Sequence, residues 1–180
     1  MAVLRDQRVG IFVDVQNLYH SAKNLYNAKV NFSVLCKHLA GGRKLIKSIA
    51  YVVQSEVDVE RPSADQKERP MSSEASFFVA LKEAGFELRL KDLQVYHGGF
   101  KKADWDVGMA VDAIRMADSY DSVVLATGDG DFVPLVEYLK WGLGKEVSIA
   151  AFSKTASQKL KESAEKFIPI EEIQKVLLKK

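Results

Sequence analysis

Two aspartates lie two positions apart in a glycine-rich turn that follows an apolar run. The stretch is TGDGDFVPLVEYL, residues 127–139, and its carboxylates belong to Asp129 and Asp131. Carboxylates this close repel each other, and a hard divalent cation with oxygen ligands relieves that repulsion. The turn is therefore a candidate metal site. Simpler roles are also open, because Asp129 suits a glycine-flanked turn and Asp131 suits the N-cap of the helix that follows.

Two more carboxylates come from distant parts of the chain. Asp14 ends the apolar run RVGIFVDV, with Asn17 three residues later, and Asp106 lies near the start of a helical pattern after the loop GGFKKAD. In a parallel sheet, sites collect beyond the carboxyl ends of the strands. If the strand 8–15 lies beside the strand 121–127, these carboxylates meet at one edge. There they could hold Mg²⁺ or Mn²⁺ for phosphodiester hydrolysis.

Strand-like and helix-like patterns alternate along the chain. Continuous apolar runs predict buried strands, and apolar residues at helical spacing predict helices. Pro134 is tolerable only in a first helical turn, which sets the start of its helix near Asp131. The alternation predicts an α/β fold with a mostly parallel sheet and helices on both faces. The predicted strands are 8–15, 44–53, 121–127 and 145–152, with short strands within 86–100, and the predicted helices are 16–29, 31–42, 73–85, 104–117 and 131–142.

Two segments depart from this alternation. Residues 55–73 are polar and contain two prolines, which predicts a long loop that either folds over a substrate or has no such role. Residues 155–180 are predicted to form a tail of two short helices. There is no internal repeat, so residues 1–180 are expected to form a single domain.

The composition sets broad limits on compartment and partner. The chain has 180 residues, a net charge of +2 and one cysteine, Cys36, which fits a reducing compartment. No apolar stretch approaches the roughly 18 residues of a membrane-spanning helix, so we expect a cytoplasmic protein with no membrane partner. The small net charge neither requires nor excludes a nucleic-acid partner.

Several other site types lack a required residue. A phosphatase of the haloacid dehalogenase type needs an aspartate where this chain has Gln16. A calcium loop that begins at Asp129 needs a glutamate where the chain has Lys140. No phosphate-binding G-x-x-x-x-G-K-[ST] motif is present. His20 and the other histidines show no metal-binding spacing, so a core or surface role is expected for them.

With these residues assembled, the sequence resembles the NYN domain family of PIN-like nucleases, and its bacterial LabA-like branch in particular. The matching motifs are FVDVQNLY, KKADWDVGMAVDAI and VVLATGDGDFVPLVEYLKWGLGKEV, and their order and spacing fit the family over roughly residues 8–170. The resemblance implies a three-layer αβα sandwich around a central, mostly parallel sheet, which is the PIN-like, Rossmannoid fold. It also implies a metal-dependent ribonuclease.

The resemblance assigns the site residue by residue. The catalytic residues would be the four aspartates and Asn17, with Mg²⁺ or Mn²⁺ bound by the aspartates. Asn17 would orient a carboxylate or donate to a phosphate oxygen. Asp112 matches a recurrent family position, and Thr127 stands where the family often has serine, so both are expected to support the site. The four metal-binding positions are Asp14, Asp106, Asp129 and Asp131.

The expected substrate is single-stranded RNA, because a cleft at the strand ends admits an extended backbone with unstacked bases. The alternative is a regulatory module that keeps the acidic pocket, binds RNA or a protein, and has little or no activity. Such a module would associate through the segment IEEIQKVLLKK, and a homodimer is a separate expectation. The cations expected to contact phosphates are Arg5, Lys23, Lys101 and Lys102, and the aromatic residues expected to stack on bases are Tyr19, Trp105 and Phe132.

Overall fold

A six-stranded sheet, parallel throughout, forms the centre of the protein in the computed structural model. The structure describes residues 5–54, 73–95, 101–102 and 104–179. The predicted loop 55–73 therefore lies, except for Ser73, outside the described residues. In spatial order the strands are β4 (Glu87–Asp92), β3 (Lys44–Gln54), β1 (Arg8–Asp14), β7 (Ser122–Ala126), β8 (Glu146–Ala151) and β9 (Lys166–Pro169).

The two central strands are neighbours, as the sequence predicted. Strand β1 pairs with β3 on one side and with β7 on the other, so the strand order changes direction between β1 and β7. Every residue of β7 is buried, which explains its continuous apolar run. A change in strand order opens a crevice at the carboxyl ends of the strands, and both strands end there.

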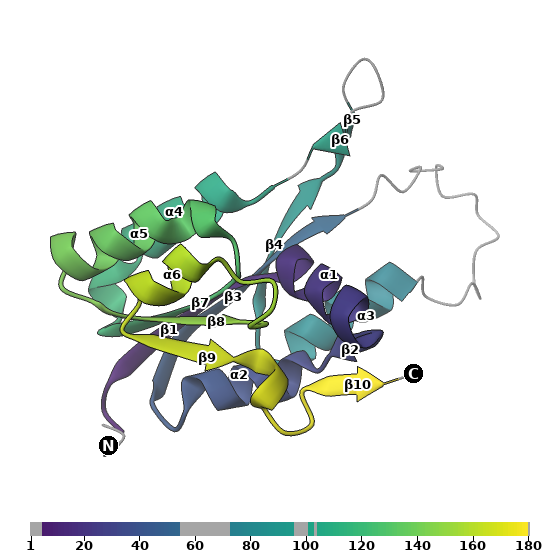
Figure 1. The fold of residues 1–180 in the computed structure, drawn as a ribbon, viewed down its shortest axis with the longest axis horizontal. Coiled ribbons are helices and arrows are strands. Elements are labelled where there is room, and N and C mark those ends of the chain that lie inside the picture. Colours follow the sequence, from purple (N-terminus) through teal and green to yellow (C-terminus); the bar gives the residue numbers. More distant parts are fainter. Residues whose placement is uncertain (1–4, 55–72, 96–100, 103, 180) are drawn as a thin grey trace, which may run out of the picture.

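Helices cover both faces of the sheet (Figure 1). Successive side chains of β1 alternate between the faces, with Ile11 and Val13 in one core and Phe12 in the other. The predicted three-layer α/β fold with a central parallel sheet is confirmed. The first core packs α1 (Val15–Tyr26), α2 (Phe32–Ala40) and α3 (Ser73–Glu83), and the second packs α4 (Asp106–Arg115), α5 (Val133–Glu137) and α6 (Gln158–Ser163).

Short elements complete the described chain. Strand β2 (Ala28–Val30) pairs with β10 (Leu177–Lys179), and β5 (Gln94–Val95) pairs with β6 (Lys101–Lys102), both antiparallel. Three 3₁₀ turns are η1 (Ala117–Ser119), η2 (Gly130–Phe132) and η4 (Ile170–Glu172), and the π-helical turn η3 (Tyr138–Gly142) extends α5. No helix in the described ranges is long and apolar enough to cross a membrane.

The prediction of a helical tail at 155–180 is wrong beyond its first helix. Only α6 is α-helical, and the chain then adds β9 to the sheet edge and β10 to β2. Pro169 lacks an N–H and stops any helix that would run through it. Ile173 and Val176 of the segment IEEIQKVLLKK are buried in the core of this same chain, and association through this segment stays a prediction.

Candidate functional site

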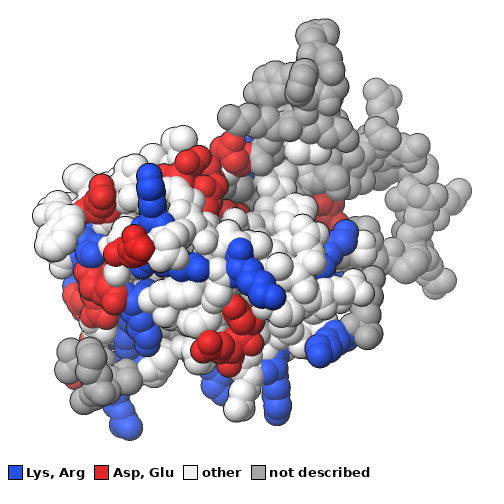
Figure 2. Space-filling view, in the orientation of Figure 1, with Lys and Arg blue, Asp and Glu red and all other residues white. Residues whose placement is uncertain are grey.

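A cavity of about 220 Å³ opens at the carboxyl ends of the central strands. Asp14 is the last residue of β1, Asp129 follows β7, and Asp106 is the first residue of α4. Acidic side chains gather at this edge, beside the start of α4 (Figure 2). The cavity is therefore lined by carboxylates from three separate parts of the chain. Its other lining residues are Gln16, Asn17, His20, Tyr51, Val53, Asp104 and Trp105.

Three carboxylates form a close cluster at the mouth of this cavity. One oxygen of each of Asp106, Asp129 and Asp131 lies within 4.8 Å of the others. Oxygen ligands of an octahedral Mg²⁺ are separated by about 3.0–4.2 Å, given ligand distances of about 2.1 Å. Small side-chain rotations would therefore bring all three to one ion. The donor set fits a hard divalent cation, because each ligand atom is a carboxylate oxygen.

Asp14 lines the same cavity but does not belong to the close cluster. Its Oδ1 accepts a hydrogen bond from the Asn17 backbone N–H at 3.1 Å, and its Oδ2 accepts from Thr127 Oγ1 at 3.2 Å. Burial is the main cause that raises the pKa of Asp14, and these two hydrogen bonds oppose it. The structure thus brings Asp14 to the shared cavity, and its role as a metal ligand remains a prediction.

Side-chain hydrogen bonds fix the turn that carries Asp129. Asn17 Oδ1 accepts from the Gly128 N–H at 2.9 Å, and Thr127 Oγ1 accepts from the Asp129 N–H at 3.3 Å. Asp129 Oδ1 accepts from the Asp131 N–H at 2.9 Å and caps the turn η2. The cap is therefore Asp129, where the sequence favoured Asp131. Asn17 and Thr127 both support the position of Asp129.

Close packing favours glycine at position 128. A Cβ atom at Gly128 would lie 3.0 Å from the Cα of Ala156, and real Cβ atoms rarely approach backbone this closely. The Gly128 carbonyl also accepts a hydrogen bond from the Ser157 N–H at 2.9 Å, just before α6. The segment that precedes α6 therefore packs directly on the aspartate turn.

Asp106 has a raised pKa, because it is partly buried and lies beside other carboxylates. Burial, followed by the charges of its aspartate neighbours, raises the pKa of Asp106 to about 6. A carboxyl whose pKa is higher in the folded than in the unfolded chain binds more protons when folded, so stability falls as pH rises. For Asp106 this loss falls between about pH 4 and pH 6. Near neutral pH, the metal-free fold therefore carries an electrostatic penalty at this position.

We predict that Asp106→Asn raises the melting temperature of the metal-free protein at about pH 7. The amide cannot ionise, so it removes the repulsion from the neighbouring carboxylates. The difference from the unsubstituted protein should disappear near pH 3, where Asp106 is mostly protonated in both the folded and the unfolded chain. Calorimetric scans in EDTA at both pH values measure this. A variant that melts lower at pH 7 would contradict the repulsion.

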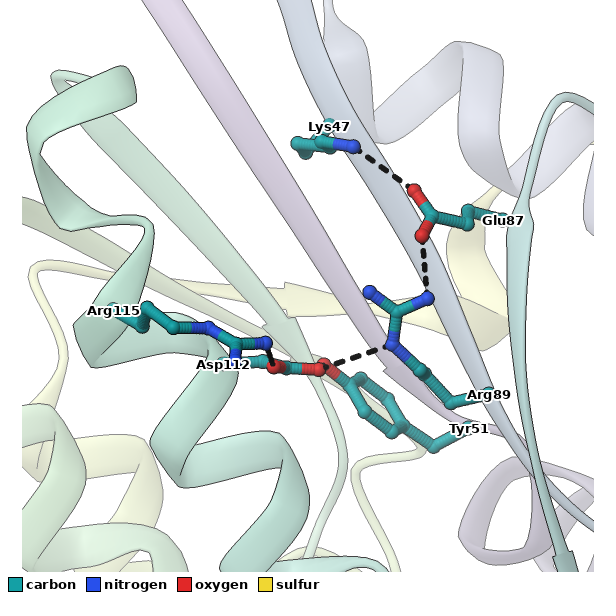
Figure 3. A network of polar contacts seen from close by, with 6 residues as sticks. All are labelled: Lys47, Tyr51, Glu87, Arg89, Asp112 and Arg115. Carbon is teal, nitrogen blue, oxygen red and sulfur yellow. Dashed lines mark hydrogen bonds and ion pairs between the residues drawn. The ribbon is translucent and has the colours of Figure 1, made fainter.

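Asp112 is buried outside the carboxylate cluster and holds a polar network (Figure 3). Tyr51 donates its hydroxyl to Asp112 Oδ2 at 2.9 Å, and Arg89 Nε lies 3.4 Å from the same oxygen. Arg115 donates to Oδ1. The Tyr51 ring packs 5.4 Å from the ring of Trp105, and both residues line the cavity. Asp112 therefore reaches the site only through Tyr51.

The prediction that Arg5 contacts a phosphate at this cavity is wrong. Arg5 lies in a turn before the start of β1, whereas Asp14 ends that strand, so the whole strand separates Arg5 from the cavity. Closeness in sequence to the first motif hid this separation. Lys101 and Lys102 form β6, and the structure does not describe their side chains.

Lys23 and the predicted stacking residues differ in their exposure. Lys23 is exposed on α1, with its Nζ 5.8 Å from the centroid of the exposed Tyr19 ring. Trp105 lines the cavity and donates its indole N–H to the Val52 carbonyl at 3.0 Å. Phe132 is only 2% exposed and packs in the core, so the prediction that it stacks on a base is wrong.

Five residues that line the cavity were not assigned to the site from the sequence, and they are Gln16, His20, Tyr51, Val53 and Asp104. His20 lies one helical turn beyond Asn17 on α1, and this spacing was the available signal, because residues three apart share a helix face. Tyr51 enters because β3 pairs with β1 in a register that sets Tyr51 opposite Asp14. No sequence pattern gave that register.

Comparisons with known proteins agree with this geometry. The family model described as "NYN domain" matches residues 8–171. The chain is 24% identical over 106 residues to "Low amplitude and bright protein LabA" of Synechococcus elongatus (strain ATCC 33912 / PCC 7942 / FACHB-805), and the match covers 56% of each chain. It is 30% identical to a protein of unknown function from Vibrio parahaemolyticus RIMD 2210633 whose crystal structure aligns with a TM-score of 0.80 over 99% of this chain and 100% of that one. The chain belongs to the NYN domain family, and its likeness to LabA supports the LabA-like branch.

Proposed function

We propose that this protein is a ribonuclease that hydrolyses phosphodiester bonds of single-stranded RNA with Mg²⁺ or Mn²⁺. The observation that carries the proposal is the close cluster of Asp106, Asp129 and Asp131 beside the cavity lined by Asp14. Family membership supports nuclease chemistry at this cluster. The experiment at the end of this section tests the need for a divalent metal and the use of RNA as the substrate.

In this mechanism the three clustered aspartates would hold the cation, and without it their shared negative charge would repel a phosphate. The bound ion would neutralise charge on the scissile phosphate and lower the pKa of an attacking water. Asn17 and Thr127 keep Asp129 in place through the hydrogen bonds of the turn. Asp14 faces the same cavity, where its carboxylate can accept a proton or a further contact from the water.

The surroundings of the cavity favour an unpaired strand. His20 and Trp105 line the cavity, and His20 and Tyr19 are exposed on α1. Aromatic rings of this kind can stack on unpaired bases, which are presented by single strands. RNA as the substrate is an inference from this chemistry and from the family.

The test follows cleavage of labelled single-stranded RNA with Mn²⁺, with Mg²⁺ and with EDTA. Cleavage should require a divalent ion and should stop in EDTA. The control for an Asp→Asn variant of the site is Asp118→Asn, which removes one carboxylate from the turn η1. Asp118 is exposed and lies outside the site, so this variant should keep its activity. Cleavage that persists in EDTA would reject the metal mechanism, and metal-dependent binding without cleavage would favour the regulatory module.

A further inference from the structure

A second cavity adjoins the carboxylate cluster, between α4 and the helical segment formed by α5 and η3. Its volume is about 340 Å³. We call it the α4–α5 groove. Its apolar walls are formed by Val107, Ala110, Ile114, Pro134, Leu135 and Tyr138.

The groove is continuous with the candidate active site. Asp106 lines both the groove and the first cavity, and Asp131 lines the groove while belonging to the carboxylate cluster. A molecule held by its phosphate at the cluster therefore has the groove as its immediate neighbour. The groove and the first cavity meet directly, because they share Asp106 as a lining residue.

The walls of the groove are open to solvent and apolar. Val107 is 75% exposed, Tyr138 is 49% exposed and Ile114 is 40% exposed, although each is a large hydrophobic residue. No lysine or arginine is among the described residues that line the groove, and its charged members are the two aspartates. This lining repels a phosphate and accepts an uncharged, flat group.

We propose that the α4–α5 groove binds the base of a nucleotide next to the scissile phosphate. This inference rests on the proposed function, because it takes the cluster as the place where the phosphate binds. The nucleotide presents its charged phosphate to the cation and its apolar base face to Tyr138 and Ile114. Every base has such a face, so the groove strengthens binding without reading the sequence.

The test compares binding of labelled single-stranded RNA with binding of an abasic strand of the same length, which keeps the phosphates. Fluorescence anisotropy measures the two affinities, with Ca²⁺ in the buffer in place of Mg²⁺ or Mn²⁺. Tyr138 is only 49% exposed, so stacking of one base on its ring should contribute modestly to the affinity. Tyr138→Ala should therefore weaken RNA binding about 5- to 10-fold and leave the abasic strand unchanged. Tyr138→Phe should restore the affinity for RNA.

Two further variants make the test specific. Trp141→Ala removes an 81% exposed aromatic residue of η3 that does not line the groove, so it should leave RNA affinity unchanged. Val107→Asp adds a carboxylate at a 75% exposed position, where folding is little affected, and should weaken RNA binding. Equal losses for Tyr138→Ala and Trp141→Ala, or equal losses for RNA and the abasic strand, would overturn the proposal.

The outcomes also separate this inference from the proposed function. Binding of RNA that depends on Tyr138 without any cleavage would reject the nuclease and keep the groove. Cleavage with unchanged affinity in Tyr138→Ala would reject the groove and keep the nuclease. No binding of RNA at all would reject both. A change of sedimentation in Tyr138→Ala without a base-dependent loss would assign the groove to contact between copies of the chain, which overturns the inference.

Discussion

Asp129→Asn is expected to lower kcat/KM for RNA cleavage by about 1,000-fold. The substitution removes one negative ligand from the cluster and leaves its two neighbours to hold the cation. A bound metal contributes several kcal/mol of transition-state stabilisation, and a loss of about 4 kcal/mol corresponds to this factor. Steady-state cleavage of labelled RNA in saturating Mn²⁺ measures it.

The same variant should fold at least as stably as the unsubstituted protein, because it also removes one repelling carboxylate from the cluster. Asparagine keeps an oxygen that can accept from the Asp131 N–H and so preserves the cap of η2. Asp129→Ala removes both the ligand and the cap, so it should lose the activity and also some stability. A fully active Asp129→Asn protein would show that Asp129 is not a ligand in the reaction.

Asp112→Ala is expected to lower the free energy of unfolding by about 2–3 kcal/mol. Asp112 is 6% exposed, and the substitution leaves the Tyr51 hydroxyl and two guanidinium groups without their shared acceptor. Breaking a buried ion pair from one side costs about 3–5 kcal/mol, and the partial exposure of Arg89 and Arg115 reduces that cost. Urea unfolding with matched m-values measures the change.

The control for this network is Arg115→Ala. The Arg115 side chain is 63% exposed, and an exposed partner contributes about 0–1 kcal/mol. The aspartate would keep Tyr51 and Arg89, so this variant should unfold nearly like the unsubstituted protein. If Asp112→Ala were equally mild, Asp112 would not be holding Tyr51 against the cavity, and its place in the site would need another explanation.

The centre of the sheet was predictable because its central strands β1 and β7 are buried on both faces. Strand β7 appears in the sequence as a continuous apolar run, and that run places Asp129 shortly after the carboxyl end of the strand. The adjacency of β1 and β7 was a hypothesis, and the paired register of Phe12 with Leu125 confirms it. The aspartates at the two strand ends then meet for geometric reasons.

The C-terminal segment was not predictable in the same way. Lys166–Pro169 is a short edge strand of four residues whose burial alternates weakly, and its sequence is also compatible with a helix. What decides the outcome is the open edge of β8, which offers unpaired backbone groups to β9. That edge exists only in the folded chain.

The sequence pointed to the aspartates that the structure brings together, but it did not point to several other residues that line the cavity. Asp106 could be placed because it begins a helix, where a carboxylate is favoured by the helix dipole. His20 and Tyr51 carry no motif of their own, and they line the cavity because of a helix face and a strand register. Arg5 failed for the opposite reason, since a strand separates residues that are close in sequence.

The most direct measurement is an anomalous difference map from a crystal soaked in Mn²⁺. Ion binding by the carboxylate cluster predicts a single strong peak within roughly 2.0–2.6 Å of an oxygen from each of Asp106, Asp129 and Asp131. A second peak nearer Asp14 would add a second ion to the same cavity. Saturating Mn²⁺ with no peak at these three aspartates, or with its peak on another surface, would contradict the metal site on which the hydrolysis depends.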